Sequence, residues 1–248
     1  MSEFLTDTDY KNILDWTKEL VDDDENHPNI SVTAAKSLPA IIKNAPGGGK
    51  FDKRLFDLCA FVLTEKKDIV KQYMIDVLQS LRNLNKNMAE DLLRSMFQVK
   101  EWRVRFMVIT NITKIGEIFG KGHLKQHMKQ YLLDSLIDTN IEIKILSLNW
   151  LYQCCEILEA EEINNQVIPC FNTLTSDNEI VVRVALAKNL CLICPLIGKK
   201  ATNDHLLSIV LNLLRDENIE VKTALLENLN GLAMTTNMVS LGQAFYPV

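Results

Sequence analysis

The chain has 248 residues, of which 47% are apolar and 24% are charged, and it holds only 9 Gly and 6 Pro. This apolar share excludes a disordered chain, and the few turn-forming residues disfavour a many-turned sandwich or barrel, so we expect one large or two small domains. A formal net charge of −5 argues against a general nucleic-acid binder, which needs surplus Lys and Arg to neutralise phosphates.

The first predicted element is a helical hairpin over residues 1–46. Its start is acidic and lacks the apolar segment of a secretory signal. No stretch of the chain approaches the roughly 18–20 uncharged apolar residues that a membrane span needs. We therefore expect a protein of the cytoplasm, with the nucleus as a second compartment, and no membrane contact. Trp16 lies in an apolar-periodic helix of this hairpin and is predicted to be a core residue.

Two motifs mark the first connections. Four consecutive acids at residues 22–25 predict an exposed loop between the first two helices, with an electrostatic docking patch as the alternative. The second predicted hairpin, residues 47–85, begins with Gly47-Gly48-Gly49-Lys50, which is similar to part of a phosphate-binding loop. Asn44 and Phe51 stand where that loop needs Gly and Ser or Thr, so the segment predicts a flexible connection.

From the third hairpin onwards the sequence repeats every 39 residues. The residues that show this period are the basic positions Arg105, Lys144, Arg183 and Lys222. Six residues before them stand Val99, Asp138, Asp177 and Asp216. Apolar residues recur four and seven positions after each basic residue, which is the spacing of one helix face. Each unit is therefore predicted to be a helix, a tight polar turn and a second helix, as in the HEAT and armadillo repeats.

The predicted fold is an all-α superhelix, a single HEAT-repeat solenoid of about six hairpins over residues 1–248. The hairpins are predicted over residues 1–46, 47–85, 86–122, 123–161, 162–199 and 200–236, with a tail over 237–248. No hairpin can bury its own apolar face, so stacking between units must supply most of the stability. The acid of one turn should reach the basic residue of a neighbouring turn. We expect such pairs to be partly exposed and worth about 0–1 kcal/mol each.

In the fourth predicted hairpin, His123 and His127 have the spacing of a metal pair on a helix. No Glu stands between them at the general-base position of a metalloprotease motif, and Lys125 and Lys129 would repel a cation. These histidines are therefore predicted to lie on a solvated surface.

In the fifth hairpin, Cys191 and Cys194 form a C-x-x-C, which can indicate zinc or redox chemistry. Cys194 shares its repeat column with Gly116, Cys155 and Ala233, so the column selects a small residue where helices approach closely. We therefore predict that Cys191 and Cys194 are small core residues, with metal binding or redox chemistry as the alternative. No acid pair or Ser-His-Asp arrangement is evident, and we expect no metal, no cofactor and no catalysis.

Several segments of the chain resemble one family of repeat proteins. They are the run 102–108, the predicted helix around residues 167–170, the turn over 213–222 and the 39-residue period. Together they are similar to the scaffolding A subunit of protein phosphatase 2A over roughly residues 50–235. The resemblance implies a non-catalytic scaffold that binds a regulatory B-type subunit and a catalytic phosphatase subunit. The chain is shorter than the scaffolds of that family and is most similar to their interior hairpins.

The resemblance also implies that partners bind along the ridge of intra-repeat turns. Carried onto this chain, the ridge consists of Lys100, Glu101, Trp102, Arg103, Asn140, Ile141, Glu142, Asn178, Glu179, Ile180, Glu217, Asn218 and Ile219. Trp102 is the preferred anchor because a large aromatic side chain at a turn can bury much surface in a partner, and packing on a neighbouring repeat is its alternative role. Trp150 lies in an apolar-periodic helix and is predicted to be core.

Two other functions compete with this one. An importin-like or armadillo-type transport adaptor would bind extended peptides through repeated Asn and Trp residues, to which Asn149, Trp150, Asn189 and Asn228 give a faint similarity. A HEAT-like DNA glycosylase would need a basic concave face and buried catalytic acids, and the acidic composition disfavours it.

Overall fold

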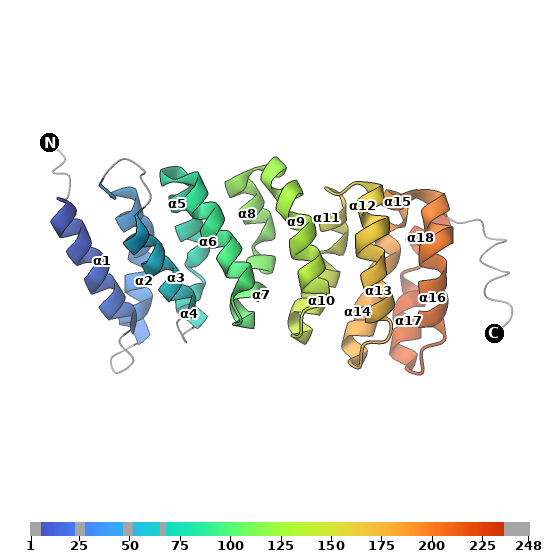
Figure 1. Ribbon diagram of the computed structural model, residues 1–248. Coiled ribbons are helices and arrows are strands. Elements are labelled where there is room, and N and C mark those ends of the chain that lie inside the picture. The colour runs from blue at the N-terminus through green and yellow to red at the C-terminus, as the bar shows by residue number, and fades with distance from the viewer. Residues whose placement is uncertain (1–5, 23–27, 47–51, 65–67, 236–248) are drawn as a thin grey trace. The chain divides into compact units, whose positions relative to one another are not determined.

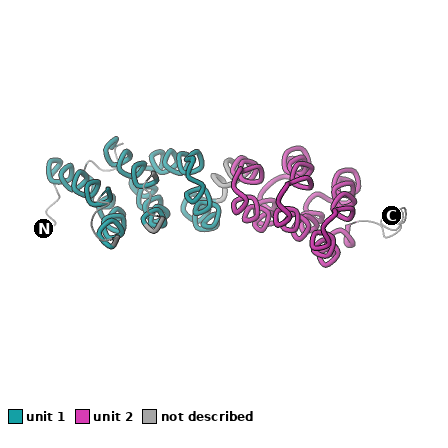
Figure 2. Tube along the Cα trace, turned by 90° about the horizontal axis from the view of Figure 1, so that it is seen from below, with its two compact units in different colours: residues 1–121 teal, residues 122–248 magenta. Residues whose placement is uncertain are grey.

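The computed structural model describes residues 6–22, 28–46, 52–64 and 68–235, and leaves out the side chains of 28, 64, 68, 69 and 121–128. Throughout these ranges the secondary structure is helical, without a β-strand, which confirms the predicted all-α class (Figure 1). The chain divides into two compact units, residues 1–121 and residues 122–248 (Figure 2). Continuity of one solenoid through both units remains a prediction.

Unit 1 is a succession of helices that pack on their neighbours in sequence. Its described helices are α1 (Asp7–Asp22), α2 (Pro28–Lys43), α3 (Lys53–Thr64), α4 (Asp68–Lys71), α5 (Met74–Leu84), α6 (Lys86–Gln98), α7 (Trp102–Thr110) and α8 (Ile112–Phe119). Helix α1 packs on α2 and α3, α3 packs on α6, and α5 packs on α2, α6 and α8. First helices of the hairpins therefore stack on first helices, and second helices stack on second helices.

Helix α6 shows how the sequence specifies these elements. The Asn85 side chain accepts a hydrogen bond from the Met88 N–H at 3.1 Å and so caps the helix N-terminus. Met88, Leu92 and Met96 recur at intervals of four residues and are fully buried against α3 and α5. The apolar stripe, more than any single polar bond, therefore stabilises the helix in its place.

Unit 2 repeats the same arrangement. Its described elements are α9 (Lys121–Leu136), α10 (Ile141–Asn149), α11 (Leu151–Cys155), α12 (Ala160–Glu162), the π-helix Ile163–Val167, α13 (Ile168–Leu174), α14 (Ile180–Asn189), the 3₁₀-helix Leu190–Ile193, α15 (Cys194–Ala201), the π-helix Thr202–Leu206, α16 (Leu207–Leu214), α17 (Ile219–Glu227) and α18 (Asn230–Thr235). Helix α14 packs on α10 and on α17, so the second helices of three consecutive hairpins form one stack. Among the side chains of this unit that the structure describes, Phe171 is the largest that is fully buried.

The second helix of each of four hairpins is interrupted at the same repeat position. The interrupting residues are Asn111, Trp150, Asn189 and Asn228, which are 39 residues apart and have φ between −97° and −117°. The amide groups of the three asparagines donate to the carbonyl oxygen four residues earlier, at 2.7–2.9 Å. At these three breaks, the amide thus supplies a donor to a carbonyl of the preceding turn. Asn189 and Asn228, two of the asparagines noted in the sequence as a possible peptide-binding signature, therefore have a role within their own helices.

Two expectations about the core are wrong. Trp16 is 61% exposed, whereas Tyr10, Leu14 and Val21 form the buried face of α1, which packs on α2 and α3. Trp150, at the break between α10 and α11, is half-buried. Residues 23–25 of the acidic run and the Gly47–Lys50 connection lie outside the described residues.

One helical run, Ile180–Leu214, is long and apolar enough to cross a membrane when judged by length and composition alone, contrary to the expectation from the sequence. The run is not one straight helix. Gly198 has a φ of 79°, in the left-handed region, and separates the end of one hairpin from the start of the next. Because 56% of the most apolar window is buried within the fold, its apolar residues are the core of two hairpins.

Candidate protein-binding ridge

The intra-repeat turns of unit 2 are built around one aspartate each. The carboxylates of Asp138, Asp177 and Asp216 accept a hydrogen bond from the backbone N–H two residues later, at 2.8, 3.0 and 2.9 Å. This bond closes the turn before the second helix begins. Asn140 and Asn218 then cap α10 and α17, accepting from Glu142 N–H at 2.9 Å and Glu220 N–H at 2.7 Å.

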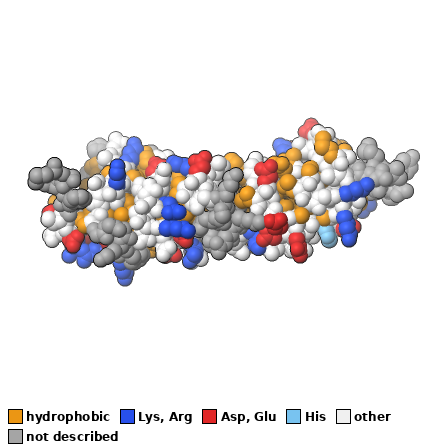
Figure 3. Space-filling model, turned by 90° about the horizontal axis from the view of Figure 1, so that it is seen from above, with side chains coloured by type: hydrophobic (Ala, Val, Ile, Leu, Met, Phe, Trp, Pro, Cys, Tyr) orange, Lys and Arg blue, Asp and Glu red, His pale blue; other side chains and the backbone are white. Residues whose placement is uncertain are grey.

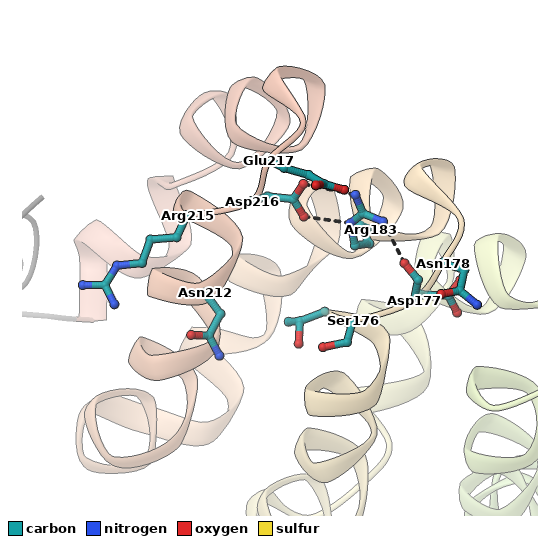
Figure 4. A pocket seen from close by; sticks show the side chains of 9 residues that line it. Ser176, Asp177, Asn178, Arg183, Asn212, Arg215, Asp216 and Glu217 are labelled. Carbon is teal, nitrogen blue, oxygen red and sulfur yellow. Dashed lines mark hydrogen bonds and ion pairs between the residues drawn. The ribbon is translucent and has the colours of Figure 1, made fainter.

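Each turn is joined to the next by an ion pair. Lys144 Nζ lies 2.6 Å from Asp177 Oδ2. Arg183 donates from Nε and Nη2 to the two carboxylate oxygens of Asp216, at 2.7 and 3.1 Å, a pair that Figure 4 shows. The third Arg183 donor, Nη1, bonds the carbonyl oxygen of Asp177 at 2.7 Å. The predicted pairing of the basic residue of one unit with the acid of its neighbour is therefore confirmed for these two pairs.

The ion pairs are more buried than expected. The Arg183 and Asp216 side chains are only 9% and 7% exposed. Burial by itself would raise the pKa of Asp216, but the hydrogen bonds from Arg183 and from the Asn218 N–H, with the charges of Arg183 and Lys222, lower that pKa below its usual value. Because removal of one partner would leave a buried charge, the estimate for exposed pairs does not apply here.

In unit 1, the turn at Lys100–Arg103 shares part of this design. Arg105 Nη1 donates to the carbonyl oxygen of Val99 at 2.6 Å, as Arg183 does to the residue six positions before it. The half-buried Trp102 ring meets Phe106 edge-on at 6.2 Å between centroids, and the Arg103 guanidinium lies over it at 4.7 Å. Trp102 thus packs on side chains of its own helix.

An apolar residue opens the second helix in each aligned unit. In unit 2 this column holds Ile141, Ile180 and Ile219 at the first positions of α10, α14 and α17. Ile141 is half-buried, whereas Ile180 and Ile219 are 40% and 70% exposed. The acids Glu142, Glu179, Glu217 and Glu220 beside them are exposed. We call residues 140–142, 178–180 and 217–220 the turn ridge of unit 2.

A groove of about 500 Å³ lies between the last two turns of this ridge (Figure 4). Its lining includes Ser176, Asp177 and Asn178 from one turn, Asn212 from α16, and Asp216 and Glu217 from the turn after α16. Arg183 also lines it and spans the two turns through its bonds to Asp177 and Asp216. Amide, hydroxyl and carboxylate groups make the groove suited to hydrogen bonds with a polypeptide backbone.

The structure places the predicted ridge residues in two separate groups. Residues 140–142, 178–180 and 217–219 lie on consecutive turns of unit 2, and residues 100–103 form a turn of unit 1. Sequence analysis missed Ser176 and Asn212, which line the groove. Neither residue is repeated in its column, so the period carried no signal for them.

The described residues contain no group of three or more metal-ligating side chains. Cys59, Cys154, Cys155, Cys191 and Cys194 are buried, as expected for small core residues. The side chains of His123 and His127 lie outside the described residues. On the face in Figure 3, the described charged side chains of both signs are mixed with apolar ones rather than gathered into a basic surface.

Comparison with protein families finds one match, to the PIK3R4-like middle domain, over residues 157–248. No curated protein matches the chain. Among solved structures, the chain is similar to Cex1p, with a TM-score of 0.60 and 15% sequence identity, over 91% of this chain and 44% of that one.

The chain is also similar to the karyopherin Kap121p. The structure of Kap121p bound to the extreme C-terminus of the protein phosphatase Cdc14p has a TM-score of 0.58 and 16% identity, and Kap121p bound to Nup53p gives the same values. In both, the match covers 96% of this chain and 27% of the other. The chain thus spans less than half the length of these structures. At such identities the likeness shows a helical repeat fold.

Proposed function

We propose that the chain is a non-catalytic helical repeat scaffold that binds a protein segment along the turn ridge of unit 2. The observation that carries this proposal is the row of isoleucines at 141, 180 and 219, which become more exposed from one turn to the next. A core position would bury these side chains, and repeated exposure of isoleucine on adjacent turns is what a docking surface requires. The buried ion pairs support the proposal because they fix the distance between turns.

The chemistry of the ridge indicates the kind of segment that binds. Glu142, Glu179, Glu217 and Glu220 surround the isoleucines with negative charge. A partner that carries apolar side chains flanked by Lys or Arg complements both features. The groove at Ser176 and Asn212 supplies polar groups for its backbone.

Two partner classes follow from the resemblances. The Kap121p structures contain bound protein segments, named as the extreme C-terminus of Cdc14p and as Nup53p, and they favour the role of a transport adaptor. The second class is a phosphatase 2A regulatory B-type subunit, with or without the catalytic subunit, which rests on the turn sequences alone. We place either activity in the cytoplasm, with the nucleus as a second compartment. Catalysis on DNA is disfavoured by the acidic charge.

The test uses the whole chain and two synthetic peptides that share an apolar core, one flanked by Lys and the other by Glu. We expect the lysine peptide to bind, and the double substitution Ile180→Glu with Ile219→Glu to weaken binding about tenfold or more. Glu at the first position of a helix suits the helix dipole, so the fold should persist. Met234→Glu is the matched control, because Met234 is 84% exposed but lies on α18, away from the turns.

Equal binding of both peptides, or binding that the double substitution leaves unchanged, would contradict the proposed ridge. Co-purification from cells then separates the partner classes. Transport cargo among the retained proteins supports the adaptor role, and a phosphatase subunit supports the scaffold role. Tight binding of duplex DNA at physiological salt would overturn both.

A further inference from the structure

Cys191 and Cys194 are brought together by a local change of helix type. Cys191 lies in the 3₁₀-helix Leu190–Ile193, and Cys194 begins α15. Side chains three residues apart are eclipsed in a 3₁₀-helix, so the two thiols lie side by side. The two thiols are close enough to shift each other's pKa, which rises for Cys191 and falls for Cys194. Both side chains are fully buried.

Pro195 explains why the helix changes type at this place. In the preceding unit, the Glu156 N–H donates to the Tyr152 carbonyl at 2.9 Å, which is an α-helical bond. Pro195 occupies the position equivalent to Glu156 and has no N–H to donate to Cys191. The Cys191 carbonyl accepts from the Cys194 N–H instead, one residue earlier. The paired thiols are therefore specific to this unit.

The surroundings of Cys194 favour its thiolate. The neighbouring Cys191 thiol lowers the pKa of Cys194, against the effect of burial. By contrast, burial raises the pKa of Cys154 to about 12. Cys194 is thus the more nucleophilic thiol, and Cys191 is placed to react after it.

Helix α18 covers this pair. A Cβ atom on Gly231 would lie 1.9 Å from the Cys191 carbonyl oxygen, so α18 rests directly on the 3₁₀ turn. The helix is six residues long, and among its side chains only Leu232 is fully buried. Such a short, weakly anchored helix can open locally while the rest of the unit remains folded.

We propose that Cys191 and Cys194 form a site of thiol–disulfide exchange with small-molecule disulfides, to which opening of α18 gives access. The Cys194 thiolate attacks one sulfur of the external disulfide, forms a mixed disulfide and releases one thiolate, which takes up a proton. The Cys191 thiol then loses its proton and displaces the second thiol, leaving an intramolecular disulfide. Two protein thiols are oxidised and one external disulfide is reduced to two thiols, so atoms and electrons balance.

The test treats the full chain with oxidised glutathione, blocks remaining thiols with N-ethylmaleimide and maps the products by mass spectrometry. We expect a disulfide within residues 191–194 in the native chain, a persistent glutathione adduct at Cys194 in Cys191→Ser, and neither product in Cys194→Ser. Cys154→Ser is the matched control and should still form the disulfide. Circular dichroism verifies that each variant is folded.

Access is tested separately. Leu232→Ala removes the buried anchor of α18 and should speed formation of the disulfide about tenfold or more, whereas Leu136→Ala, an equal truncation elsewhere in unit 2, should not. Modification of the half-buried Cys170 with no reaction at Cys191 and Cys194 would overturn the site. Equal rates in the two leucine variants would overturn the role of α18.

Discussion

Arg183 donates three hydrogen bonds from one guanidinium group, two to the Asp216 carboxylate and one to the Asp177 carbonyl. A lysine could not make all three with the same geometry, because only guanidinium offers a planar fork of donors. The residue therefore closes its own turn and binds the next one at once.

The first prediction concerns this residue. Arg183→Ala should lower the free energy of unfolding by about 3–5 kcal/mol, because it leaves the Asp216 carboxylate buried without its partner. Replacement of both partners by Met and Leu should restore most of the loss. Urea denaturation measures both effects. Lys86→Ala, which removes an exposed pair with Glu90, should change stability by about 0.5 kcal/mol or less.

The second prediction concerns pH. The pKa of Asp216 is lowered in the folded chain, so its contribution to stability is complete above the unfolded value of about 3.9 and is lost as pH falls through the folded value. The stability difference between the native chain and Asp216→Asn should therefore shrink below about pH 4. Urea midpoints at a series of pH values measure it. A constant difference down to pH 3 would show that the carboxylate does not titrate in this way.

At the scale of the element, the interrupted second helices are the feature that sequence analysis did not foresee. The asparagines at 111, 189 and 228 were visible in the sequence, but a polar residue on a helix gives no sign that its amide donates to a carbonyl at a break in that helix. Trp16 was misassigned for a related reason, since periodicity cannot tell which of two apolar stripes on α1 faces the core. The repeat columns, in contrast, were predictable because each position serves the same contact in every unit.

The third prediction tests the helix interruptions. Asn228→Ala should destabilise unit 2 by about 1 kcal/mol, because the Ala224 carbonyl loses the donor that lies 2.7 Å away. Thermal unfolding followed by circular dichroism measures the loss. Asn172→Ala, at an exposed position of α13, serves as a control and should have little effect.

At the scale of the whole molecule, the helices of each unit pack mainly on their neighbours in sequence, as in other repeat proteins. The sequence could predict the parts of the candidate site that lie at positions repeated in every unit. The turns of unit 2 followed from the columns, and their use as a binding ridge was predicted from the family resemblance. The groove at Ser176 and Asn212 and the paired thiols, in contrast, depend on combinations of residues that occur in one unit alone. A period predicts what units share, and it carries no information on how one of them differs.

The fourth prediction follows from packing between neighbours. Arg183→Ala should reduce protection from amide hydrogen exchange most strongly in α14, α16 and α17, and leave α3, α5 and α6 of unit 1 protected. Mass spectrometry of exchanged peptides measures the pattern. An equal loss across both units would show that the chain opens as one cooperative body.

The bonds of the turns have a consequence for how such a chain can change in length. Lys144 and Arg183 occupy the same column, and each binds an aspartate 33 residues later. If one whole period were removed, for example residues 178–216, Asp177 would be followed directly by Glu217. Lys144 would still face Asp177, and Lys222 would take the place of Arg183, six residues after that aspartate. Gain or loss of a complete 39-residue block within these turns therefore preserves the pairing of each basic residue with the next aspartate.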